Sequence, residues 1–138
     1  MSYVFYPGCS LEGTARDFHL STLAVAKGMG LALPEIPGWI CCGSTAAHSS
    51  DPVLALALPA QNLQAAAKMK TPDGGPTVAV ACAACYSRLK VANHHIAHEP
   101  QTRRKVAQAL GSDYDGQVPV KHLLEILGRD VGPKSIAA

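Results

Sequence analysis

The spacing of hydrophobic residues changes several times along this 138-residue chain, and each change predicts a different element. Residues 4–6 form a short apolar run that Pro7-Gly8 ends, and residues 77–81 form a continuous, β-branched apolar run. Unbroken runs of this kind are typical of strands buried on both faces of a parallel sheet. We therefore expect two strands here, with a further brief strand in the Pro-rich connector at residues 31–37.

Two longer stretches have the period of amphipathic helices. The first begins at Ser10, ends at Gly28 and Gly30, and has an expected inward face of Leu11, Ala15, Phe18, Val25 and Met29. The second begins at Asp51-Pro52, a capping acid followed by a helix-starting proline. Its expected inward face is Val53, Leu56, Ala60, Leu63 and Ala67. Pro59 lies inside this stretch and predicts a kink or split near Leu58.

Three more helices are expected at residues 83–97, 101–110 and 118–127. The last would turn Val120, Leu123, Leu124 and Leu127 inward. Strands that alternate with helices predict an α/β fold, a small and mostly parallel sheet flanked by helices. We assign residues 1–128 to one domain and residues 129–138 to a linker or disordered tail.

Composition narrows the range of functions. The chain is 48% hydrophobic and 16% charged with a net charge of +2, which indicates a globular domain with no nucleic-acid partner. No signal peptide and no membrane span of ~18 apolar residues is evident. We therefore expect a cytoplasmic protein, in which thiols stay reduced.

The five cysteines all belong to one pattern: Cys9, then Cys41-Cys42-Gly43, then the C-x-x-C pair Cys82 and Cys85. Cys9 and Cys82 follow expected strands, and ligands gather at the carboxyl ends of parallel strands. The pattern therefore predicts a metal site at that edge of the sheet.

Several chemistries fit part of this pattern. A structural zinc or an ordinary cubane iron–sulfur cluster takes four ligands, one fewer than the chain offers. A thioredoxin-like C-x-x-C would leave Cys9, Cys41 and Cys42 without a role. Purely structural cysteines would explain neither the adjacent pair nor the C-x-x-C spacing. His94 and His98 have metal-ligand spacing on a helix but no H-E-x-x-H carboxylate, which favours a solvated face. His48 could hydrogen-bond near the site or lie on the surface.

The segments 6–15, 39–43 and 82–86 resemble the cysteine-rich CCG domain in the B-type component of heterodisulfide reductase, because the residues that flank each cysteine also match. The resemblance implies a noncubane [4Fe-4S] cluster held by Cys9, Cys41, Cys42, Cys82 and Cys85. It implies electron transfer to a small disulfide substrate such as CoM-S-S-CoB, which the cluster reduces. The implied partners are a C-type iron–sulfur subunit and a flavin-bearing A-type subunit.

One difference from that family is that its B-type component has two CCG repeats, whereas this chain has one. The resemblance therefore also implies a second CCG domain as partner. Two other functions stay open: an electron-relay subunit of a lactate or succinate type of dehydrogenase, and a zinc-stabilised structural domain.

Overall fold

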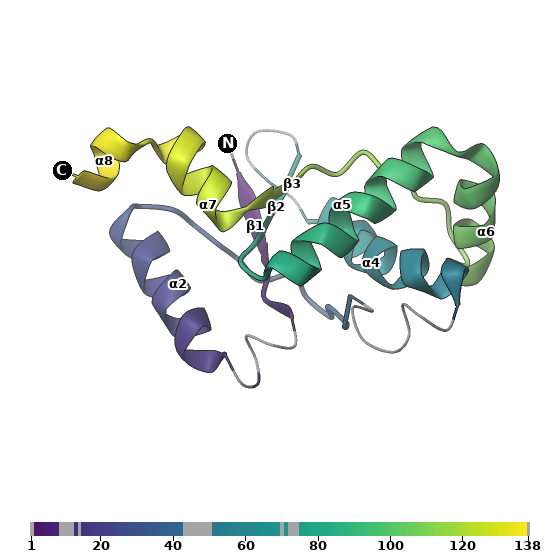
Figure 1. Cartoon of the computed structure of the whole chain (residues 1–138), viewed down its shortest axis with the longest axis horizontal. Coiled ribbons are helices and arrows are strands. Elements are labelled where there is room, and N and C mark those ends of the chain that lie inside the picture. Colours follow the sequence, from purple (N-terminus) through teal and green to yellow (C-terminus); the bar gives the residue numbers. More distant parts are fainter. Residues whose placement is uncertain are drawn as a thin grey trace.

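The computed structural model describes residues 2–8, 13, 15–42, 51–69, 71 and 75–137. Its centre is a sheet of three parallel strands, β1 (Tyr3–Tyr6), β2 (Thr77–Val80) and β3 (Val120–His122), in the order β1-β2-β3 (Figure 1). Tyr3 pairs with Thr77, and Val80 pairs with His122. The predicted parallel α/β fold is confirmed.

Both faces of the sheet are buried because the strands are apolar at nearly every position. Val4, Tyr6, Val78, Val80 and Val120 point into one hydrophobic cluster, and Tyr3, Phe5 and Ala79 point into another. Since side chains alternate along a strand, each face collects every second residue. The continuous apolar runs in the sequence therefore correspond to a two-sided core.

Helices α4 (Pro52–Ala67), α5 (Ala83–His98) and α6 (Pro100–Leu110) cover the first face, on the right in Figure 1. Asp51 caps α4 by accepting a hydrogen bond from the Val53 N–H at 2.9 Å, as its sequence predicts. Ala60 and Leu63 are buried as expected, but Ala67 is exposed. Helix α4 is continuous through Pro59, so it is not split near Leu58, and the alternative, a kink there, stays a prediction.

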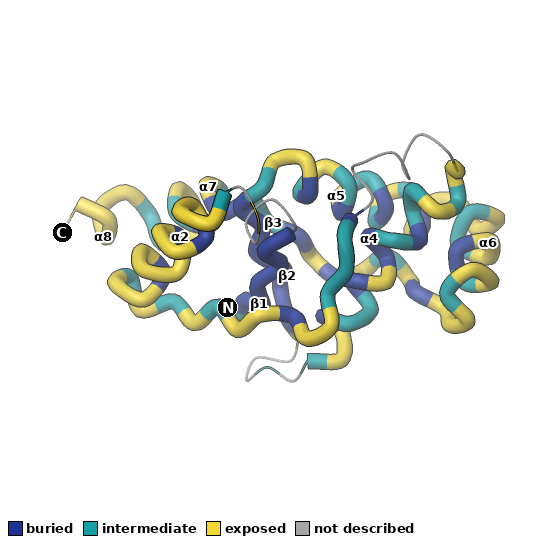
Figure 2. The backbone as a smooth tube through the Cα atoms, turned by 90° about the horizontal axis from the view of Figure 1, so that it is seen from below, coloured by how far each residue is buried: buried dark blue, intermediate teal, exposed yellow. Residues whose placement is uncertain are grey.

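Helix α2 (Arg16–Gly28) lies on the second face, where His19 contacts Phe5. Its expected inward face is wrong, because Phe18 and Val25 are 47% and 45% exposed while Thr22 and Ala26 are buried. Small and polar residues thus let the helix approach the sheet, and the larger apolar residues flank that contact. Figure 2 shows the strands as buried and α2 as largely exposed. The expected start of this helix, Ser10 to Glu12, lies outside the described residues.

The connector at residues 31–37 does form the expected brief strand contact, a parallel bridge between Glu35 and Phe5. Phe5 donates to the Pro34 carbonyl at 2.7 Å, and its own carbonyl accepts from Ile36 at 2.9 Å. This contact holds the stretch that leads to Cys41 and Cys42 against β1.

The expected helix at 118–127 is wrong at its start. Residues 120–122 form β3, and only then do the short helix α7 (Leu123–Glu125) and the π-helix η1 (Ile126–Val131) follow. Because a strand precedes α7, Leu124 is 72% exposed and Leu123 and Ile126 face the core. Helix α8 (Pro133–Ala137) then follows, and Tyr3 donates a hydrogen bond to Asp130 at 2.5 Å. The domain boundary at residue 128 stays a prediction.

Candidate metal centre

The C-x-x-C pair lies where β2 becomes α5, at the carboxyl edge of the sheet. Strand β2 ends at Val80, Cys82 occupies the N-cap position of α5, and Cys85 lies in its first turn. The first turn contains no acidic residue. The N-terminus of a helix favours negative charge, so both cysteines occupy positions that suit ligands of a metal ion.

The CCG stretch and the C-x-x-C pair, 40 residues apart in sequence, meet at this edge. The sulfur atoms of Cys42 and Cys85 lie 3.4 Å apart and share a hydrogen bond, and both residues are buried. Cys41 and Cys82 are half-buried, and Cys82 packs between the clusters on the two faces of the sheet. The predicted meeting of these two motifs is therefore present.

Crowding of thiols changes the acidity of the innermost one. The hydrogen bond with Cys42, burial, and the nearby Cys42 and Cys82 thiols together raise the pKa of Cys85 far above its ordinary value. Thiolates so close together repel one another unless a cation lies among them. Deprotonation of this group of cysteines is therefore expected to accompany metal binding.

Gly8 provides room for Cys85. A Cβ atom at Gly8 would lie 2.9 Å from the Cys85 sulfur, and Gly8 has a φ of +76°. Only glycine combines this close approach with a left-handed backbone at low cost. The residue just before Cys9 is thus shaped around the C-x-x-C pair.

The backbone before Cys41 is fixed from two sides. Asn62 on α4 accepts a hydrogen bond from the Ile40 N–H at 2.8 Å and donates to the Ile40 carbonyl at 3.0 Å. The Tyr6 hydroxyl, at the end of β1, donates to the same carbonyl at 2.7 Å. Trp39 packs edge-on against Tyr6, with ring centroids 5.6 Å apart. These contacts hold the CCG stretch against the sheet edge.

Sequence reasoning missed Asn62 and assigned no role to Tyr6. A signal for Asn62 was present in the sequence, because it is a polar residue among Ala60, Leu63 and Ala66 on the buried face of the helix. A buried amide without a hydrogen-bond partner costs free energy, so a partner for Asn62 could be expected. Nothing in the sequence indicated that its partner would be the backbone of residue 40.

Part of the predicted site lies outside the described residues. Cys9, Gly43 and His48 belong to that part, so their predicted roles stay predictions. Within the described ranges, no three His, Cys, Asp or Glu side chains already stand together at metal-binding distance. The described thiols nevertheless fit a thiolate-bound metal group, because Cys42 and Cys85 are in contact and glycine at position 8 lets the Cys85 sulfur lie close to the backbone.

A cavity of about 720 Å³ opens next to this edge. Its lining includes Tyr86, whose N–H donates to the Cys82 carbonyl at 2.9 Å, and His122, which ends β3. The rings of Tyr86 and His122 meet edge to face, 5.6 Å apart. One lining residue, Tyr86, follows Cys85 directly in the sequence, so the cavity lies on the same side of the sheet edge as the start of α5.

His94 and His98 do not belong to the cysteine site. They lie near the other end of α5, where both side chains are exposed. Neither ring packs into the hydrophobic core, which agrees with the solvated face that the sequence favours.

The fold and these contacts define a class: a small parallel α/β domain that gathers cysteines at the carboxyl edge of its sheet. The profile of the cysteine-rich domain family CCG matches residues 3–90. The chain belongs to this family.

Curated relatives resemble the chain over nearly its whole length. The 8-methylmenaquinol:fumarate reductase membrane anchor subunit of Wolinella succinogenes is 32% identical over 94% of this chain. A protein of Archaeoglobus profundus, named as similar to the B-type component of heterodisulfide reductase, is 26% identical over 96% of it. The B-type component of the ferredoxin/F420H2-dependent CoB-CoM heterodisulfide reductase of Methanosarcina acetivorans is 23% identical over 95%. All three names refer to components of reductases.

The chain spans less than half of these relatives, 44%, 44% and 43% of their lengths. Among the described helices, none has the length and apolar character that a membrane crossing requires.

Proposed function

We propose that this chain is the iron–sulfur domain of a heterodisulfide reductase-like complex, and that it passes electrons to a small disulfide and reduces it. The observation that carries the proposal is the contact between Cys42 and Cys85, which joins the CCG and C-x-x-C motifs at one sheet edge. The names of the relatives from Archaeoglobus profundus and Methanosarcina acetivorans support the same activity.

In this proposal Cys9, Cys41, Cys42, Cys82 and Cys85 hold a noncubane [4Fe-4S] cluster. When bound, such a group supplies one-electron transfer. The chain's own part is to hold the thiolates together: α5 offers its N-terminus to Cys82 and Cys85, and Asn62 and Tyr6 fix the backbone before Cys41. Burial of Cys42 and Cys85 excludes water from the inner side of the site.

The cavity beside Tyr86 and His122 is the proposed place for the disulfide. Reduction of a disulfide consumes two electrons and two protons and yields two thiols. His122 is well placed to guide a substrate, because its Nδ1 accepts from the Leu124 N–H at 3.1 Å and thereby fixes the orientation of its ring. The electrons would come from a C-type iron–sulfur subunit and a flavin-bearing A-type subunit.

Iron counting tests the metal assignment. After anaerobic reconstitution we expect about four irons per chain and an EPR signal unlike that of a cubane. About one zinc and no iron, with iron and sulfide supplied, would identify a structural zinc domain instead. Serine at Cys41 or Cys42 should change the EPR signal, and an unchanged spectrum would remove that cysteine from the ligand set.

A second CCG domain is the proposed missing part of the catalytic site. The isolated chain should then reduce disulfides slowly or not at all, and activity should appear when a second CCG domain is added. Rapid turnover by the purified chain alone would refute this part of the proposal.

The relative from Wolinella succinogenes favours a second candidate function. Its name describes a fumarate reductase subunit, and it is 32% identical to this chain. In that case the domain would relay electrons within a dehydrogenase of the succinate type and bind no disulfide. Reduction of the iron by a quinol, with no oxidation by any added disulfide, would favour the relay.

The first proposal, a domain of a heterodisulfide reductase-like complex, includes a cytoplasmic location.

A further inference from the structure

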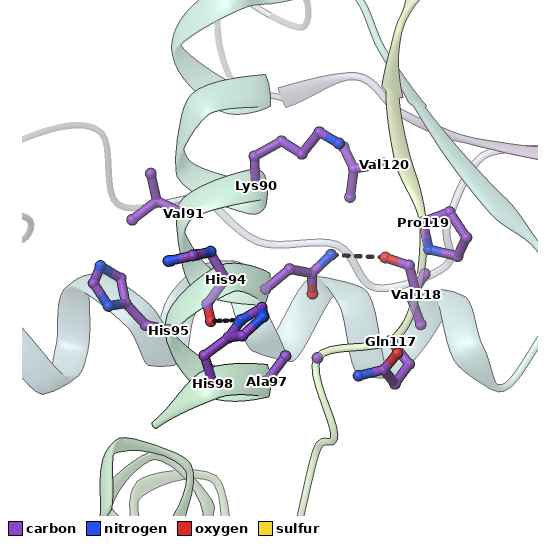
Figure 3. A pocket seen from close by; sticks show the side chains of 12 residues that line it. Lys90, Val91, His94, His95, Ala97, His98, Gln117, Val118, Pro119 and Val120 are labelled. Atoms are coloured by element: carbon purple, nitrogen blue, oxygen red, sulfur yellow. Dashed lines mark hydrogen bonds between the residues drawn. The ribbon is translucent and has the colours of Figure 1, made fainter. Parts of the chain in front are cut away.

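The histidines at the far end of α5 form a group separate from the cysteines. His94 lies nine residues beyond Cys85 on the same helix, which places it roughly 13 Å further along the axis. His94, His95 and His98 line a cavity of about 820 Å³ between α5 and residues 116–120 (Figure 3). We propose that His94 and His98 bind a divalent transition-metal ion such as Zn²⁺ here.

The spacing of the two rings suits a shared metal ion. Their centroids lie 4.7 Å apart, and their planes are tilted by 32°. Two imidazoles that bind one ion at 2.0–2.1 Å place their ring centres roughly 4.5–5.2 Å apart, for bond angles from octahedral to tetrahedral. The two rings are therefore already at chelating separation, and rotation of the His94 side chain would direct its Nε2 at an ion bound to Nε2 of His98.

The hydrogen bond of His98 leaves Nε2, the nitrogen atom that would bind the metal ion, facing the solvent. Its Nδ1 lies 2.8 Å from the His94 carbonyl, and a carbonyl oxygen can only accept, so Nδ1 carries the proton. In the neutral ring Nε2 then presents a lone pair to solvent. A metal-binding histidine usually donates its other N–H in this way, which fixes ring orientation and raises ligand basicity. An anion would instead need a proton on Nε2, so the neutral form favours a cation.

The charged groups nearby do not occupy the ring nitrogen atoms that His94 and His98 would offer to a metal ion. His95 is paired with Glu99, and the other oxygen of Glu99 accepts from the Thr102 hydroxyl at 2.9 Å. Neither ring nitrogen of His94 has a hydrogen-bond partner within the described part of the chain. The Lys90 ammonium, which lines the same cavity, lies over the Tyr86 ring at 5.8 Å from its centre. Its chain extends toward Val120 in Figure 3.

The helix that carries the pair is held rigidly. Leu89, Ala92 and Ile96 are buried, and Asn93 donates to the Val118 carbonyl at 2.7 Å. Ligands on a packed helix keep their relative positions better than ligands on a loop. Since no described third ligand stands with the pair, water would complete the coordination of the ion in this open cavity.

Histidine nitrogen NMR during a Zn²⁺ titration tests the site directly, because it reports each ring separately. Thiols elsewhere in the chain can take up the first zinc without obscuring the histidine signals. We expect the Nε2 signals of His94 and His98 to shift together and to saturate at one ion per pair. The signals of His95, held by Glu99, should not follow them. A linear response without saturation, or one confined to a single ring, would overturn the proposal.

Variants of the three histidines on α5 give a matched comparison. His98→Gln and His94→Gln should each weaken zinc binding by about tenfold or more, the lower limit for losing an outer partner of a metal ligand. His95→Gln should leave it unchanged. Equal effects at all three positions would show a diffuse surface attraction. The outcome is independent of the iron assignment, because the histidine signals can be followed with or without iron at the cysteines.

Discussion

The side chain of Asn62 forms a two-way bridge to the backbone of Ile40. Its carbonyl oxygen accepts from the Ile40 N–H, and its amide donates to the Ile40 carbonyl, at 2.8 and 3.0 Å. Because Cys41 follows directly, the position of the first CCG cysteine depends on a residue of helix α4. This bridge therefore couples the stability of the core to the geometry of the proposed metal site.

Asn62→Leu should therefore affect both properties. Loss of the amide leaves the Ile40 N–H without its side-chain partner, and such a loss costs about 1–3 kcal/mol in the free energy of unfolding. We also expect less iron to be retained per folded chain. Thermal unfolding and iron analysis on the same samples measure the two effects.

Asn93→Leu is the matched control. Asn93 also donates to a backbone carbonyl, that of Val118 at 2.7 Å, but it lies more than two helical turns from the cysteines along α5. It should lower stability while the iron content of the folded protein stays at the wild-type level. Equal iron losses in the two variants would mean that Asn62 acts only through general stability.

Gly8→Ala should disturb the metal centre more than the fold. Alanine at a φ of +76° is strained by about 1–2 kcal/mol, and its Cβ would also lie 2.9 Å from the Cys85 sulfur. Gly30→Ala provides the comparison, since Gly30 has a φ of +73° with open space around it. We expect similar falls in melting temperature but a loss of iron only at Gly8. Normal iron binding by Gly8→Ala would show that Cys85 can move without consequence.

The strand at residues 120–122 can be tested with two neighbouring leucines. Leu123 is 9% exposed and Leu124 is 72% exposed. Leu124→Gln should change the free energy of unfolding by less than about 0.5 kcal/mol. Leu123→Gln should cost about 2 kcal/mol or more, because it removes buried apolar area and buries an amide. Urea unfolding of both variants measures the difference. Large costs at both positions would support the helix expected from the sequence, in which both leucines face inward.

The contact between Tyr3 and Asp130 predicts a dependence of stability on pH. Hydrogen bonds from Tyr3 and from Lys121 lower the pKa of Asp130 below its ordinary value of 3.8. The ionised carboxylate therefore stabilises the folded state fully above pH 3.8, and this contribution disappears as the pH falls through the lower pKa of the folded state. The difference in melting temperature between wild type and Asp130→Asn should be constant from pH 7 to about 5 and shrink below about 4.

Tyr3→Phe gives an independent check on the same hydrogen bond. It should remove part of the effect on its own and add little in the Asp130→Asn background, because both changes break one interaction. A difference between wild type and Asp130→Asn that persists unchanged at pH 3 would show that the charge of Asp130 is not involved.

Local patterns predicted those parts of the fold that depend on local chemistry. The runs at residues 4–6 and 77–81 are strands, and Asp51-Pro52 starts a helix, because burial and capping act within a few residues. The inward face of α2 was not predictable in this way. Its apolar residues occur on both sides of a narrow contact, and only the shape of the sheet selects Thr22 and Ala26.

In the candidate site, too, local sequence predicted some features and packing between distant elements determined the others. Cysteine spacing and the strand ends placed Cys82 and Cys85 at the correct edge and brought Cys42 to them. The anchoring of Ile40 by Asn62 and Tyr6 depends on how α4 packs on the sheet, and no local pattern encodes that packing. Residues 120–122 were assigned to a helix because Val120 and Leu123 also fit a helical period. They form a strand instead, because they pair with β2.

The pairing of Tyr3 with Thr77 has a consequence for biosynthesis. At 5–20 residues per second, a ribosome needs roughly 4–15 seconds to make the chain between these two partners. Throughout that interval the first strand lacks its β2 neighbour, and the sulfur atoms of Cys42 and Cys85 have no fixed distance between them. Delivery of the proposed metal group must therefore come after translation of β2 and α5, so a carrier protein that loads it would have to recognise a folded surface rather than a nascent chain.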